Sequence, residues 1–106
     1  MILLVESVVV APDDTDAYLD AFERLYLPGA TKRGMELVSC WHTPREIGED
    51  VTVTVVFRLD SWRAWEMIRN AAVGDPSMPE WIAARHALMK HGTRRFAEPA
   101  SFSPLQ

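Results

Sequence analysis

The sequence predicts an α+β protein with the ferredoxin-like element order βαββααβ. Residues 51–59, VTVTVVFRL, place apolar side chains at every second position, which is typical of a strand with two different faces. From Trp62 onward, the apolar residues recur at helical spacing instead. A strand that runs directly into an amphipathic helix leaves that helix lying across one face of its sheet. We therefore expect a four-stranded antiparallel sheet with all helices on one face.

Length and charge limit what the chain can do. Its 106 residues, 48% of them apolar, are enough for one domain with one core. We expect that domain at residues 1–98, followed by a loosely held C-terminal tail at 99–106. The formal net charge is −4, and no basic run is longer than Arg94-Arg95. Nucleic-acid binding is not expected, because neutralising phosphates takes clustered lysines and arginines.

The single cysteine and the first residues indicate a cytoplasmic protein. Cys40 is the only cysteine, which excludes an intramolecular disulfide and suits a reducing compartment. We expect it to be a buried, inert thiol, because no adjacent cation would activate it. The opening run MILLVESVVVA lacks a basic start and is too short to span a bilayer. We interpret it as a strand and expect no membrane association.

The first strand is predicted at Ile2–Val10, where almost every residue is apolar. Such a run is typical of a strand that is buried on both faces. Pro12–Thr15 forms a turn with N-cap candidates for a helix. The apolar stripe of that helix consists of Tyr18, Ala21, Phe22, Leu25 and Tyr26. Pro28-Gly29 is expected to end the helix.

Two further strands are predicted to form an antiparallel hairpin. The first runs from about Met35 to Thr43, and a polar connection at 44–50 leads to the strand at 51–59. Alternation puts Leu37, Ser39 and Trp41 on one face of the first strand, and Val38, Cys40 and His42 on the other. Asp60 and Ser61 then offer side chains that would cap the following helix.

The end of the chain is predicted to hold a last helix and a short strand. A Gly-Asp-Pro break at 74–76 precedes the helix, which is expected at about Glu80–Lys90. Gly92 is expected to end the helix. His91 is expected to have a structural role, because a cation at this end of a helix interacts favourably with the helix dipole. The last strand is predicted at Thr93–Ala97.

The sheet face that points away from the helices has no predicted cover. It carries part of the first strand together with Thr52, Thr54, Val56 and Arg58. Burying a valine, leucine or isoleucine is worth about 1.5–3 kcal/mol, so leaving several of them in water is unfavourable. A second copy of the same sheet would cover them. We therefore expect a homodimer through the open sheet face, in which the two sheets form a barrel.

The stretch GMELVSCWHTPREIGEDVTVTVVFRLDSWRAWEMIRNAAVGDPSMPEW resembles the second half of NIPSNAP-type proteins. The shared pattern is a strand ending in a Trp-rich segment, a polar hairpin, a strand ending in an aromatic residue and Asp-Ser, and then a helix. Asp75, Pro76 and Trp81 match the segment that opens the last helix. The resemblance implies the dimeric α+β barrel superfamily, which includes cofactor-free monooxygenases, polyketide cyclases, muconolactone isomerases and haem-degrading enzymes. NIPSNAP-type proteins have no agreed catalytic motif, so no functional residue is transferred from them.

Haem degradation is the one activity of that superfamily that individual residues test. Haem-degrading members resemble one another in using an asparagine on the first strand, a tryptophan and a haem-ligating histidine. The only asparagine here is Asn70, in a predicted helix. Trp65 and His86 have the right residue types, but the segment 74–79 separates them. Haem degradation is therefore disfavoured, whereas simple haem binding through a histidine stays open.

Two histidines are the candidate catalytic residues, because an imidazole titrates near neutral pH, at about 6.5. His42 ends a strand beside Trp41, and His86 lies on the flank of the last helix. The alternative is that both are partly exposed surface residues without a part in any chemistry.

Two arginines are candidate substrate-binding residues. Arg85 falls near the middle of the apolar arc of the last helix, which is costly unless the guanidinium is paired or faces a cavity. It would bind an anionic group of a ligand, or else pair with Glu6 or another acid. Arg58 shares a strand face with threonines and a valine. It would line a barrel cavity, or else form a salt bridge at the rim of the dimer interface.

Glu6 and three aromatic residues complete the substrate-binding set. Glu6 interrupts an apolar strand, so it is either a buried carboxylate with a raised pKa or a member of an ordinary ion pair. Tyr18, Trp41 and Trp65 are either core residues or, as the resemblance implies, part of an aromatic-rich pocket between sheet and helices.

Two functions follow from these residues. No metal-ligand spacing, phosphate-binding loop or nucleophile elbow occurs, and we expect neither a metal nor a cofactor. The first function is a cofactor-independent enzyme, an isomerase, cyclase or monooxygenase, that acts on a small hydrophobic molecule by proton transfer. The alternative is a non-catalytic homodimer that binds a ligand or serves as a structural module.

Overall fold

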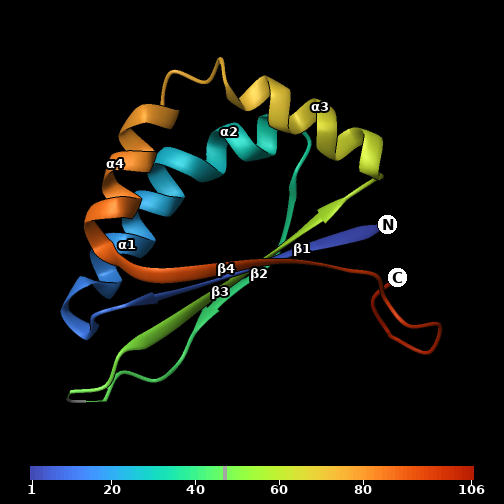
Figure 1. Ribbon diagram of the computed structural model, residues 1–106. Helices are drawn as coiled ribbons and strands as arrows, with labels where there is room; N and C mark the ends of the chain where they lie inside the picture. Colours follow the sequence, from blue (N-terminus) through green and yellow to red (C-terminus); the bar gives the residue numbers. More distant parts are fainter. Residues whose placement is uncertain (47) are drawn as a thin grey trace.

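Within residues 1–46 and 48–106, which the computed structural model describes, four strands alternate with helices in the predicted order (Figure 1). The strands are β1 (Ile2–Val10), β2 (Glu36–His42), β3 (Val51–Leu59) and β4 (Met89–Ala97). The helices are α1 (Thr15–Ala21), α2 (Leu27–Lys32), α3 (Trp62–Ala72) and α4 (Met78–Leu88). A 3₁₀ turn η1 (Pro12–Asp14) precedes α1, and a π-helical turn η2 (Phe22–Tyr26) joins α1 to α2. The predicted connection at 44–50 includes residue 47, which lies outside the described residues.

The described strands form one antiparallel sheet in the order β2-β3-β1-β4. The helices all lie on one face of this sheet, as predicted, and the chain leaves the other face open (Figure 1). Glu6 on β1 pairs with Val55 on β3 and with Arg94 on β4. Because cross-strand partners point to the same face, this register decides which side chains meet beneath the helices.

The alternation predicted for β3 is confirmed. Val51, Val53, Val55, Phe57 and Leu59 are buried in the core, at most 4% exposed. Thr52, Thr54 and Arg58 are half-buried on the open face, and Val56 between them is buried. The odd-numbered positions of β3 therefore make the floor on which the helices pack.

β1 is buried on one face only, and the prediction of two buried faces is wrong for the single chain. The buried positions are Ile2, Leu4, Val8 and Val10, and the half-buried ones include Leu3, Val5 and Val9. An apolar run shows that both faces avoid water, but not what covers each of them. The helices of this chain cover one face, and the second face lies toward the open side of the sheet.

A bulge in β2 corrects the predicted faces of that strand. Leu37 pairs with Phe57 and Ser39 pairs with Val56, which leaves Val38 as the extra residue. Leu37 therefore shares the helix-covered face and does not lie with Ser39. The bulge arises from pairing with β3 and leaves no trace in the alternation of β2 itself.

Cys40 is exposed, and the prediction of a buried thiol is wrong. β2 is an edge strand, so no further strand covers its outer side. Partial burial still raises the pKa of the Cys40 thiol. A raised pKa keeps the reactive thiolate scarce, in agreement with the expected inertness.

The first helix continues through Pro28-Gly29 as α2, and the prediction that it ends there is wrong. Pro28 follows the π-helical turn and stands in the first turn of α2, where a missing N–H is tolerated. The helical segment ends at Lys32 and is followed by Gly34 with a φ of 103°. Only glycine adopts such a backbone without strain, so Gly34 is the residue that stops the helix.

Gly29 serves a different purpose, a close approach between two segments. Arg33 at the end of α2 forms an ion pair with Asp75 in the α3–α4 connection, with 2.6 Å between Nη1 and Oδ2. A Cβ at position 29 would collide with that carboxylate oxygen. The missing side chain therefore lets the pair form and tie α2 to the connection.

The cap predicted for α3 is confirmed, because the Ser61 hydroxyl accepts a hydrogen bond from the Ala64 N–H at 3.0 Å. The predicted end of the last helix is wrong. α4 stops at Leu88 and β4 begins at the next residue, so His91 and Gly92 lie in a strand. They belong to β4 because they pair with β1: His91 lies opposite Val9, and Gly92 lies opposite Val8.

Candidate functional site

A cavity of about 230 Å³ lies between the helix-covered face of the sheet and the helices. This is the liquid volume of roughly seven or eight waters, and it falls below the roughly 300–1,000 Å³ of typical ligand pockets. Its polar lining consists of Glu6, Arg33, Arg69, Arg85 and Arg94. Its aromatic lining consists of Phe22, Tyr26, Trp65 and Trp81. A ligand here would be small, with room for one or two rings.

Three aromatic rings form one wall of the cavity. Phe22 and Tyr26 both come from the π-helical turn η2, with ring centroids 5.5 Å apart. Trp81 on α4 lies 5.8 Å from Phe22 and 5.4 Å from Tyr26, centroid to centroid. π-helical turns are often found at functional sites. This one places two aromatic side chains on the same wall, where their mutually tilted rings offer apolar and aromatic contacts to a ligand.

Tyr26 brings a hydroxyl group to this wall. That hydroxyl donates to Sδ of Met35 at 3.8 Å, which is a weak hydrogen bond. Burial raises the pKa of Tyr26, and the nearby Glu6 carboxylate raises it further, while Arg33 opposes the rise. Tyr26 therefore keeps its proton at neutral pH and remains a hydrogen-bond donor.

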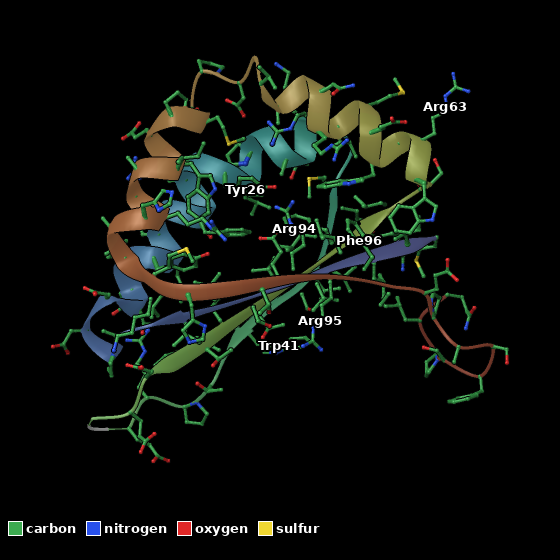
Figure 2. The ribbon with its side chains drawn as sticks, in the orientation of Figure 1. Tyr26, Trp41, Arg63, Arg94, Arg95 and Phe96 are labelled. Carbon is green, nitrogen blue, oxygen red and sulfur yellow. The ribbon has the colours of Figure 1, made fainter. Side chains whose placement is uncertain are left out.

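Glu6 and Arg94 form an ion pair across β1 and β4. Arg94 Nη2 lies 2.8 Å from Oε1 of Glu6, and its Nε donates to the same oxygen at 3.0 Å. Figure 2 shows Arg94 between the sheet and the helices, on the side where Tyr26 lies. The guanidinium carbon also lies 5.4 Å from the ring centroid of Trp65, a cation–π distance. The Glu6 side chain is 18% exposed, so the pair is partly desolvated.

Arg33 also lines the cavity. Besides its ion pair with Asp75, its guanidinium carbon lies 5.9 Å from the ring centroid of Tyr26. The backbone N–H of Ser77 and the Arg33 guanidinium lower the pKa of Asp75. Within the described part of the chain, the buried Nε of Arg33 has no hydrogen-bond partner.

Arg85 enters the cavity from α4. It is half-buried, and it forms no ion pair with any residue that the structure describes. Burial raises the pKa of the neighbouring Tyr18 to about 12, although the Arg85 guanidinium opposes this rise. Tyr18 is therefore neutral beside Arg85 and supplies no balancing charge.

Three of the predicted site residues, Glu6, Trp65 and Arg85, line this one cavity. Tyr18 stands behind its aromatic wall, with its ring centroid 5.7 Å from that of Trp81. The structure therefore brings together residues of β1, α1, α3 and α4 that are far apart in the sequence. Of the two alternatives for Glu6, the ion pair is the one observed.

The other predicted residues lie away from the cavity. His42 is exposed at the end of β2, with Nδ1 2.8 Å from the carbonyl oxygen of Thr43. His86 is exposed on α4. Trp41, which is 56% exposed, points to the open side of the sheet in Figure 2. Arg58 lies on the same side, opposite Leu3 in the register.

Sequence reasoning missed Arg33, Arg94 and Tyr26 as cavity residues. A signal existed for Arg94, because an acid in β1 and a base in β4 are complementary if the two strands are neighbours. Using it required the register that places Glu6 opposite Arg94. No comparable signal marked Arg33, whose helix was expected to end before it.

Two features, a membrane-spanning helix and a cluster of metal ligands, are absent from the described residues. Among them, no helix is both long and apolar enough to cross a membrane. Nor do they contain a group of three or more His, Cys, Asp and Glu side chains arranged to hold a metal ion.

Solved structures that share this fold include the following three. The first is an uncharacterized NIPSNAP domain protein from Burkholderia xenovorans, with 19% identity, 98% of this chain and 99% of that chain covered, and a TM-score of 0.82. The second is a NIPSNAP family protein of unknown function from Agrobacterium tumefaciens, with 19% identity, coverage of 100% and 94%, and a TM-score of 0.78. The third is a putative antibiotic biosynthesis monooxygenase from Nitrosomonas europaea, with 9% identity, coverage of 93% and 98%, and a TM-score of 0.68.

At such identities these structures show the fold alone. No curated protein matches the chain. The family model described as NIPSNAP matches residues 8–104, from within β1 to beyond the end of β4. That match includes the end of β1, the other three strands, the helices and all of the cavity lining except Glu6, and on it the chain belongs to the NIPSNAP family.

Proposed function

We propose that this protein binds a small hydrophobic molecule in the cavity and converts it by proton transfer, without a metal or an organic cofactor. The observation that supports this most directly is the Glu6 carboxylate, which stands among aromatic side chains in a cavity of about 230 Å³. Isomerase and cyclase reactions suit such a site, because they move protons and leave the overall oxidation state unchanged.

Glu6 is the proposed proton acceptor. Both close contacts of Arg94 are to Oε1, and among the described residues no hydrogen bond reaches Oε2. One oxygen is therefore anchored while the other stays free for a substrate C–H proton. Tyr26, which keeps its own proton, would donate a hydrogen bond to a carbonyl oxygen that gains negative charge. The predicted catalytic residues His42 and His86 stay outside this scheme, because neither lines the cavity.

Deuterium exchange tests the proposed chemistry. The protein would be incubated in D₂O with 2-tetralone, a small bicyclic ketone with acidic C–H groups, and incorporation would be followed by NMR. We expect faster exchange with the parent protein than with buffer, and a loss of that acceleration in Glu6→Gln. Glu36→Gln is the matched control, because Glu36 is exposed on β2 and lies outside the cavity. Equal rates for Glu6→Gln and the parent would remove Glu6 from this role.

A cavity-filling pair tests where the ligand lies. Ala72 on α3 lines the cavity, whereas Ala83 on α4 is exposed and does not. We expect Ala72→Leu to weaken 2-tetralone binding at least tenfold in calorimetry and Ala83→Leu to leave it unchanged. If both variants bind like the parent, the ligand site lies elsewhere.

The second candidate function is a ligand-binding protein without catalysis. The observation that favours it is the ion pair of Glu6 with Arg94, together with the exposed positions of both histidines. The same two experiments separate the candidates. A binder would respond to Ala72→Leu in the calorimetric titration, yet it would accelerate deuterium exchange in no variant.

We further propose that two copies pair through the open sheet face in the reducing cytoplasm. The half-buried Leu3, Val5 and Val9 and the exposed Trp41 support this, because together they leave apolar surface in water. Val5 lies in the middle of that face, opposite Val56 and Arg95. Val5→Glu should therefore convert a dimer into a monomer in light scattering. Met67→Glu, at a 65% exposed position of α3, is the control that should stay dimeric.

A further inference from the structure

The cavity carries more positive than negative charge, although the whole chain has a formal net charge of −4. Its described lining contains the four arginines 33, 69, 85 and 94 and a single acid, Glu6. Two of the arginines are balanced, Arg33 by Asp75 and Arg94 by Glu6. The positive excess is thus a local property of this cavity and does not reflect a basic protein.

Arg85 is the centre of this excess. It is half-buried, and no acid among the described residues pairs with it. Removing a guanidinium from water without a partner is costly, so a site that keeps one is suited to receive an anion. The planar fork of arginine also matches the two oxygens of a carboxylate. Arg69 is exposed on α3 and adds charge at the rim.

Arg33 brings a further guanidinium to the same cavity. Within the part of the chain that the structure describes, Nε of Arg33 is buried and has no acceptor. Arg33 lines the same cavity as Arg85 and lies over the Tyr26 ring. Because that Nε is itself buried, an anionic group that enters the cavity would meet one unpaired guanidinium, that of Arg85.

We propose that the ligand is a small aromatic molecule with a single carboxylate, which Arg85 binds while the ring lies against Phe22, Tyr26 and Trp81. The proposal rests on the proposed function, since it specifies the molecule that the cavity receives. The wall of three tilted rings favours an aromatic body, which it can meet through face and edge contacts, and the unpaired arginine selects a negative charge. One negative charge is sufficient, because Arg85 is the half-buried guanidinium without an acid partner among the described residues, whereas Arg69 is exposed at the rim.

A matched pair of probes tests the charge directly. The compounds 2-naphthoate and 2-naphthamide share the same rings and nearly the same shape, and differ in a carboxylate against a neutral amide. Isothermal titration calorimetry on the full chain at low salt is expected to show naphthoate binding at least tenfold more tightly than naphthamide.

Arginine variants then locate the charge that is recognised. Arg85→Gln should reduce the naphthoate-to-naphthamide preference to near one, chiefly by weakening naphthoate binding. Arg85→Lys, which keeps the charge without the fork, should keep part of the preference. Arg63→Gln is the matched control, because Arg63 points outward from α3, away from the sheet, and does not line the cavity (Figure 2). It should bind both probes like the parent.

The outcomes separate this inference from the proposed function. If the parent binds both probes equally well, the inference is wrong while a ligand site in the cavity stands. If it binds neither probe and also fails to bind 2-tetralone, both fail. A preference that survives in Arg85→Gln would overturn the role of Arg85. The two probes on the parent protein decide the question of charge even if Arg85→Gln does not fold.

Discussion

Replacing Gly29 by alanine tests how the helical segments beside the cavity are held together. A Cβ at this position would collide with Oδ2 of Asp75 and would lie 2.9 Å from Nη1 of Arg33. Those atoms form an ion pair whose side chains are 9% and 12% exposed. The added methyl group must therefore separate the pair or push α2 away from the α3–α4 connection.

Two effects of opposite sign decide the size of the change. Alanine in place of a helical glycine stabilises a helix by about 0.8–1 kcal/mol. An extra methyl group forced into a close-packed contact costs about 1–3 kcal/mol. We expect the steric cost to prevail, because the colliding atoms belong to a buried pair with little room to move. The difference between these ranges is a net loss of up to about 2 kcal/mol, which corresponds to a melting temperature lower by up to roughly 16 °C.

Thermal and urea unfolding would measure this, with Gly74→Ala as the matched control. A Cβ at Gly74 meets only the carbonyl oxygen of Ala71, at 3.8 Å, which is an ordinary contact. That variant should be as stable as the parent or slightly more stable. In an Asp75→Ala background the collision with the carboxylate is absent, and the Arg33 guanidinium, 2.9 Å from the new Cβ, has lost the partner that held it, so Gly29→Ala should cost much less there. Equal effects of Gly29→Ala in both backgrounds would refute the reasoning.

Three further changes test single features of the fold. Ser61→Ala removes the α3 cap and should lower the free energy of unfolding in urea by about 0.5–2 kcal/mol. The pKa of Asp75 is lowered by the Ser77 N–H and by Arg33, so its stabilisation is complete above the usual value of 3.8 and is lost as pH falls through the lower folded-state pKa. The urea concentration at half-unfolding should therefore fall less steeply at acidic pH in Asp75→Asn than in the parent. Burial raises the pKa of Tyr18 to about 12, so its stabilisation is present below the usual value of 10.0 and is lost as pH rises through about 12. In an ultraviolet titration, the tyrosine that ionises at the highest pH in the parent should be missing from Tyr18→Phe.

Much of the fold was predictable because many elements depend on residues a few positions apart. The alternation in β3 and the Ser61 cap are patterns of this kind, and the structure confirms both. Pro28 was misinterpreted because proline breaks a helix interior but suits a first turn, and only the preceding π-helical turn shows which case applies. The bulge at Val38 depends on β3, so β2 alone could not reveal it.

The candidate site was predictable only in part. Glu6 and Arg85 could be predicted as binding residues because each is a charge in an apolar pattern, and both line the cavity. His42 and His86 were candidates through the chemistry of imidazole alone, and their positions in the fold lie outside the cavity. A charged residue within an apolar pattern indicates that its side chain lies among buried residues. The residue type alone does not indicate where a side chain lies in the fold.

The sequence by itself determined the fold class, the helix-covered face of β3 and the excess of apolar surface on the open face. These follow from local periodicity, which depends on the geometry of neighbouring residues. Only the tertiary structure decided which charges meet. Glu6 and Arg94 are 88 positions apart and pair because β1 and β4 are neighbours in the sheet. Among the described residues Arg85 has no acid partner, because the register gives the cavity acid Glu6 to Arg94. Electrostatic interactions depend on distance in space, not along the chain.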